Sequence, residues 1–109
     1  MKLATCKSAG PDGQLIVVSN DGCKALPAGL QWPNLLFVME NWDAASPDLS
    51  NVAAELNAGG GQVLDRESLR APLPRSWQWL DGSALATHGE LMQVAFGLDP
   101  INTERPLMY

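Results

Sequence analysis

Short apolar segments alternate with turn sequences near the start of the chain. Residues 2–7 and 14–19 flank a Gly-Pro-Asp-Gly turn at residues 10–13, in which proline presets φ and glycine accepts a positive φ. A second turn, Asn-Asp-Gly at residues 20–22, is a strong hairpin signal and leads into residues 23–26. The pattern predicts three antiparallel strands that are joined as a meander.

A pattern that predicts a helix follows a loop at residues 27–33. Asn34 is a suitable N-cap, because its side-chain oxygen can accept a hydrogen bond from an unpaired N–H of the first turn. Leu35, Met39 and Trp42 recur on one face of this helix, and we expect that face to meet the meander.

A second helix is expected to begin at residues 46–48, where a serine cap, a first-turn proline and an aspartate occur together. Apolar residues then repeat at helical spacing until three glycines, residues 59–61, end the helix. These glycines lack the following Lys-Ser/Thr of a phosphate-binding loop, so we interpret them as a helix stop. The core is predicted at Leu15, Val17, Leu36, Met39, Trp42, Val52 and Leu56.

The composition changes after residue 61. Residues 62–74 contain two prolines and several charges, as linkers do. Residues 76–80 predict a short strand in which Trp77 and Trp79 share one face. We expect this pair to belong to the core or to wall a pocket.

A third helix is predicted over residues 84–96, with Ser83 as its N-cap and Gly97 at its end. No periodicity follows in residues 98–109. The predicted fold class is α+β: a small antiparallel β-meander with two packed helices, followed by a short strand and a helix.

Composition narrows the classes of function. Apolar residues make up 46% of the 109, which is enough for one core and argues against disorder. The formal net charge is −5 and the seven cations are dispersed, which disfavours nucleic-acid binding. No apolar run approaches the length of a membrane span, and the N-terminus does not resemble a signal peptide. Cys6 and Cys23 are expected to be reduced thiols in a cytoplasmic protein.

His88 is the only histidine, so any histidine chemistry must use it. Helical spacing puts it on the face of Leu85 and Met92, and we expect it to point inward. Asp81 ends the predicted strand, on the face that carries Trp77. Two interpretations remain open at this point: His88 is a hydrogen-bonded core residue, or Asp81 and His88 converge on a pocket as a metal ligand and a general base.

Residues 72–84 read PLPRSWQWLDGSA and are followed by His88. This stretch resembles the junction between the N-terminal and catalytic domains of bacterial fumarylacetoacetate hydrolase family proteins. The MKLAT opening, the strand at residues 15–19, LNAGGG at residues 56–61 and the closing PLMY are also similar, in matching order. The resemblance extends over essentially the whole chain.

The resemblance implies a metal-dependent hydrolase that cuts a carbon–carbon bond in a β-diketo acid such as fumarylacetoacetate or an acylpyruvate, as in aromatic catabolism. It implies that Asp81 binds a divalent cation (magnesium, manganese or calcium) and that His88 activates the attacking water. Tyr109 would contact the substrate. The physical sense is that the cation polarises the carbonyl under attack and stabilises the departing enolate.

The resemblance also implies two domains: an N-terminal α+β domain at residues 1–71, and the truncated start of a mostly-β catalytic domain at residues 72–109. The Glu-x-Glu ligands, a further acid and the lysine of the family site are missing from this sequence. We therefore expect the chain alone to bind no cation and to be inactive. The expected partners of the parent protein are a small dicarbonyl acid and a second copy, as a homodimer, with no nucleic acid and no membrane.

Two alternatives remain. One is a non-catalytic interaction or dimerisation module that descends from the same domain. The other is a keto-acid decarboxylase or hydratase, because the same kind of metal site serves enolate chemistry generally.

Overall fold

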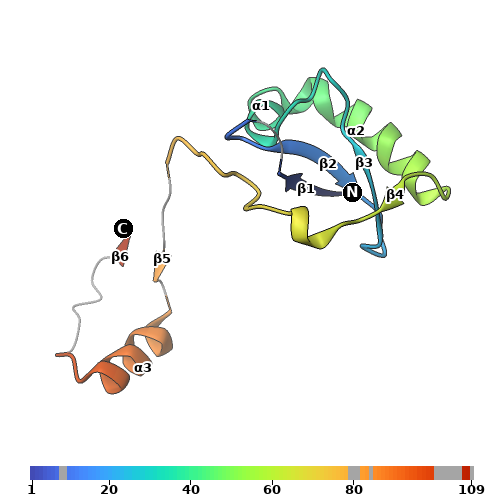
Figure 1. The fold of residues 1–109 in the computed structure, drawn as a ribbon. Coiled ribbons are helices and arrows are strands. Elements are labelled where there is room, and N and C mark those ends of the chain that lie inside the picture. The colour runs from blue at the N-terminus through green and yellow to red at the C-terminus, as the bar shows by residue number, and fades with distance from the viewer. Residues whose placement is uncertain (8–9, 79–81, 84, 100–106, 109) are drawn as a thin grey trace. The chain divides into compact units, whose positions relative to one another are not determined.

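Two units make up the fold of the computed structural model, residues 1–76 and residues 77–109 (Figure 1). The first is a small α+β fold, as the sequence predicted. Residues 72–76, which follow the predicted boundary at residue 71, are part of this unit, and the Thr5 hydroxyl donates a hydrogen bond to the Pro72 carbonyl. The structure describes residues 1–7, 10–78, 82–83, 85–99 and 107–108.

The predicted meander is confirmed. Strands β1 (Lys2–Cys6), β2 (Gln14–Val18) and β3 (Lys24–Pro27) are antiparallel neighbours in that order. Leu3 lies opposite Val17, so both side chains point to the same face of the sheet.

A fourth strand, β4 (Gln62–Val63), was not predicted and pairs with β3 at the edge of the sheet. Residues 62–74 were interpreted as a linker, and that interpretation is wrong at its start. A strand of two residues is too short to show alternation, and only its pairing with Lys24 and Ala25 defines it.

Helix α1 (Leu35–Glu40) begins as predicted, since the Asn34 side chain accepts a hydrogen bond from the Phe37 N–H at 2.9 Å. Helix α2 (Trp42–Asn57) begins earlier than predicted, at residue 42 and not at the Ser-Pro-Asp sequence. Pro47 therefore lies inside the helix, where it removes one backbone hydrogen bond near the helix start.

The triple glycine ends α2 as predicted. The helix stops at Asn57, and Gly59 and Gly61 have φ of 107° and 84°. Such left-handed conformations are open to glycine at little cost and strained for most other residues. The sequence feature that resembles a phosphate cradle is therefore a helix stop.

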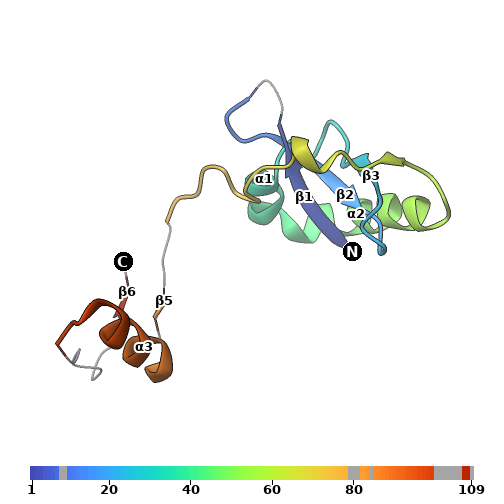
Figure 2. The same ribbon diagram turned by 60° about the horizontal axis from the view of Figure 1, so that its bottom comes forward.

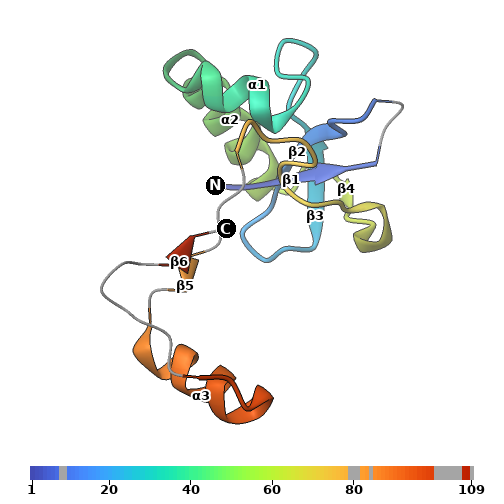
Figure 3. The same ribbon diagram turned by 90° about the vertical axis from the view of Figure 1, so that its left-hand side faces the viewer.

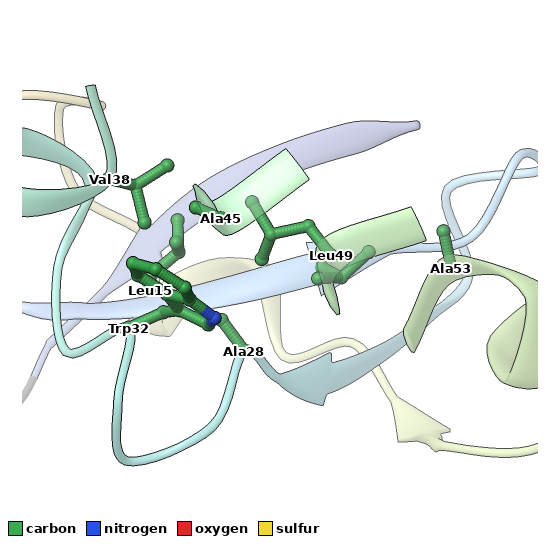
Figure 4. Packing of buried hydrophobic residues seen from close by; sticks show 8 residues of the cluster. Leu15, Ala28, Trp32, Val38, Ala45, Leu49 and Ala53 are labelled. Atoms are coloured by element: carbon green, nitrogen blue, oxygen red, sulfur yellow. The ribbon is translucent and has the colours of Figure 1, made fainter. Parts of the chain in front are cut away.

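The core lies between the sheet and the two helices, which pack on the same face of it (Figure 2). Figure 4 shows side chains of the loop, α1 and α2 gathered around Leu15 of β2. Leu15, Val17 and Leu56 are buried as predicted. Val52 packs against this cluster and is partly buried, and Leu36 is also partly buried.

Two residues were wrongly predicted to lie in the core. Met39 is 58% exposed and Trp42 is 41% exposed. Because α1 ends at Glu40 and Asn41 caps it, Trp42 belongs to the next helix and the assumed single stripe does not exist. Val38 occupies the inward position on α1.

Trp32, from the loop before α1, fills the space beside Leu15. It is 8% exposed, and its indole N–H donates to a carboxylate oxygen of Asp48 on α2 at 3.0 Å. A buried tryptophan stabilises the fold because its ring removes a large apolar area from water and its indole N–H has a hydrogen-bond acceptor. This contact fixes the loop to α2.

The second unit consists of α3 (Ala86–Phe96) and a two-stranded antiparallel sheet of β5 (Gly82–Ser83) and β6 (Leu107–Met108), seen side by side in Figure 3. Gly97 ends α3 with a φ of 62°, as predicted. The predicted cap Ser83 instead lies in β5, and Leu85 is the N-cap.

Two further expectations for this region were wrong. Residues 76–78 of the predicted strand form no strand, and its last two residues lie outside the described part of the chain. Trp77 is 84% exposed and is therefore not a core residue. Residues 98–109 show no periodicity, and they include β6, a strand of two residues that only its pairing with β5 defines. In the described ranges, no helix is long and apolar enough to cross a bilayer.

We predict that Gly13→Ala destabilises the first unit by about 1–3 kcal/mol. Gly13 has a φ of 69°, and an added Cβ would lie 2.5 Å from Thr5 Cγ2 and 2.6 Å from the Cys6 carbonyl oxygen. Urea denaturation of both proteins measures the loss.

Gly10→Ala in the same turn is the matched control. Its added Cβ would meet no atom within 4 Å, so stability should change by less than about 0.5 kcal/mol. Equal losses from the two substitutions would contradict the steric argument.

Candidate functional site

His88 lies in the first turn of α3, where its backbone N–H donates to the Leu85 carbonyl at 3.0 Å. Its side chain is exposed, and so are those of Leu85 and Met92 on the same face. The expectation that His88 points inward is therefore not met among the described residues of the second unit, in which α3 has no buried side chain.

Asp81 and Tyr109, the other two predicted site residues, lie outside the described residues. Their sequence neighbours Gly82 and Met108 are opposite each other in the β5–β6 sheet. Helix α3, which carries His88, lies between these two paired strands in the sequence.

Metal-ligating side chains do not gather anywhere in the described part of the chain. No group of three or more His, Cys, Asp and Glu side chains is placed to hold a cation there. Glu90 is two positions after His88 on α3, which directs it to a different side of the helix. The described residues therefore do not make up a cation site by themselves.

A shallow hollow of about 270 Å³ lies in the first unit, between the β2–β3 turn and the end of α2. Its polar groups are already engaged. Lys24 Nζ donates to the Gly59 carbonyl at 2.9 Å, and the Asn20 N–H donates to Asn57 Oδ1 at 3.1 Å. The lining residues are Ser19, Asn20, Asp21, Lys24, Leu56, Asn57 and Gly59.

Asp21 is the acid of this hollow. The Ser19 hydroxyl and the Cys23 N–H donate hydrogen bonds to its carboxylate, which lowers the pKa of Asp21. A carboxylate held in this way stays ionised and fixes the β2–β3 turn. Lys24 meanwhile caps the carbonyl end of α2, where a cation is favourable. The residues that line the hollow thus hold the β2–β3 turn against the end of α2, and their polar groups serve this contact.

Sequence reasoning missed one set of contacts. Arg75 forms an ion pair with Asp12, and that pair lowers the pKa of Asp12 and raises the pKa of Arg75. The two residues are 63 positions apart. A single sequence carries no signal that would pair them.

The comparisons with known proteins concern mainly the first unit. A family model described as fumarylacetoacetase N-terminal domain 2 matches residues 1–75. No curated protein matches the chain.

We predict that the chain of residues 1–109 shows no saturable binding of Mg²⁺ or Mn²⁺ at millimolar concentration. One or two side-chain ligands leave a hard cation mostly hydrated. Isothermal titration calorimetry measures this directly. Tight stoichiometric binding would contradict it, and Asp81→Ala would then show whether that residue is a ligand.

Proposed function

The chain belongs to the fumarylacetoacetase N-terminal domain 2 family, and we propose on that basis that it is the N-terminal portion of a metal-dependent hydrolase. The substrate class is a β-diketo acid of the fumarylacetoacetate or acylpyruvate type, in which a carbon–carbon bond is cleaved. The family match over residues 1–75 is the single observation that carries this proposal.

The character of α3 gives further support. Leu91, Val94 and Phe96 are all more than half exposed, and the apolar residues of this helix do not form one narrow stripe. A helix that is apolar on several sides is suited to burial within a larger body. In this proposal, the remainder of a catalytic domain packs around α3.

The proposal gives three residues roles. Asp81 supplies a carboxylate oxygen, which is the ligand type that hard cations prefer. His88 accepts the proton of the attacking water, since a neutral imidazole nitrogen is a proton acceptor of the kind that general bases use. Tyr109 contacts the substrate. A bound divalent cation would supply Lewis-acid polarisation, and its remaining ligands would come from outside the described residues.

A second candidate function is a non-catalytic dimerisation module. The same exposed apolar residues of α3 favour it, because a second copy would also bury them. Light scattering separates the two candidates. A dimer of residues 1–109 that Val94→Asp converts to a monomer would favour the module, whereas a monomer at all concentrations would favour the incomplete catalytic domain.

We predict opposite signatures for two substitutions in a protein that joins this chain to its catalytic domain. His88→Ala should lower kcat by on the order of 10²- to 10⁴-fold and leave cation affinity unchanged, because it removes a general base. Asp81→Ala should weaken cation binding as well as turnover. Turnover of a dicarbonyl acid and calorimetric titration with Mg²⁺ measure the two effects.

Glu90→Gln on the same helix is the matched control, and it should retain normal turnover. Near-normal turnover of His88→Ala would overturn the assigned role of His88. Loss of turnover in Glu90→Gln as well would show that α3 is merely sensitive to any change.

A further inference from the structure

The last part of the first unit, residues 64–75, runs from one side of the sheet to the other, and we call it the strap (Figure 1). At its start the Leu64 N–H donates to the Cys23 carbonyl, just before β3. Further along, the Arg70 N–H donates to the Thr5 carbonyl of β1 at 2.9 Å. The strap therefore connects the two sides of the meander.

Thr5 also holds the strap by its side chain, and we call this contact the anchor. The Thr5 hydroxyl donates to the Pro72 carbonyl at 2.6 Å, and Thr5 is 1% exposed. A buried hydroxyl that loses its acceptor keeps the full cost of desolvation. The anchor is thus part of the core, and breaking it should affect the stability of the whole unit.

The next contact along the strap, which we call the clasp, lies at the surface. Arg75 Nε donates to Asp12 Oδ1 at 2.7 Å, and Arg75 Nη2 donates to Asp12 Oδ2 at 2.6 Å. This two-point geometry fixes direction as well as distance. The Arg75 side chain is 63% exposed and that of Asp12 is 22% exposed, so water and salt compete with the pair.

The clasp joins two places that matter for the rest of the chain. Asp12 lies in the β1–β2 turn, and Arg75 lies two residues before Trp77, at which the second unit begins. A weak contact at this position can open without loss of the core, whereas the buried anchor cannot.

We propose that Asp12 and Arg75 form a clasp that fixes the direction in which the chain leaves the first unit. Opening the clasp releases residues 73–76, the end of the first unit, while the Thr5–Pro72 anchor keeps that unit folded. The clasp is therefore a conformational device. Its role does not depend on which reaction the parent protein performs.

Arg75→Gln and Asp12→Asn in the full chain test the proposal by NMR relaxation of backbone amides. Both should lower the order parameters of Arg75 and Ser76 from about 0.85, the value for rigid backbone, to below about 0.6. Both should leave the urea midpoint of the first unit unchanged. Wild-type protein in 1 M NaCl should resemble Arg75→Gln, because salt screens exposed pairs.

Arg70→Gln is the matched control, since it removes the same charge from an exposed strap residue that has no side-chain ion pair among the described residues. It should leave the order parameters of Arg75 and Ser76 at the wild-type value. The charge swap Asp12→Arg with Arg75→Asp should restore the wild-type value after either single change has lowered it.

Thr5→Val tests the anchor separately, and it should lower the urea midpoint. If this variant fails to fold, the anchor is confirmed as part of the core, and the clasp is still decided by the surface variants. Order parameters that stay at the wild-type value in Arg75→Gln would overturn the proposal. So would an equal drop in Arg70→Gln, because that would reflect charge alone.

Discussion

The first unit depends on burying β2 on both of its faces. Leu15 and Val17 are 0% exposed, and Ile16 and Val18, which point the other way, are 7% exposed. Helices α1 and α2 cover the face of Leu15 and Val17. The strap bonds to the Cys23 carbonyl beside β3 and to Thr5 of β1, so it is attached to the sheet at both of its ends. The strap is therefore part of the domain and is not a linker, which explains why the first unit extends to residue 76.

Local chemistry made much of this fold predictable. The two hairpin turns, the Asn34 cap and the glycine stops after α2 and α3 all act over a few residues, and a single sequence displays them in full. The prediction of the core was wrong at positions whose burial depends on more than the neighbouring sequence. Met39 and Trp42 were assigned to one stripe, but a cap at Asn41 divides that stripe. The residue that fills the space is Trp32, and its position depends on a hydrogen bond to Asp48 on another element.

The elements that could not be predicted are those defined by distant partners. Strands β4 and β6 have two residues each, so alternation cannot reveal them, and pairing alone makes them strands. The Asp12–Arg75 pair is of the same kind, because nothing near either residue indicates the other. For the candidate site, helical spacing identified the face of His88, but burial of that face requires a partner, which spacing cannot supply. The roles of Asp81, His88 and Tyr109 come from the family resemblance.

The family evidence and the proposed chemistry lie on different units. The match covers residues 1–75, nearly the whole first unit, whereas Asp81, His88 and Tyr109 all belong to the second. Among the described residues of the first unit, the polar groups of its hollow are engaged in holding the β2–β3 turn against α2. Under the proposed function, the first unit would supply no reacting group, and its contribution would be structural. Substitutions in the first unit should then act through stability or through the path of the chain beyond Arg75, and the strap is the segment through which either effect would pass.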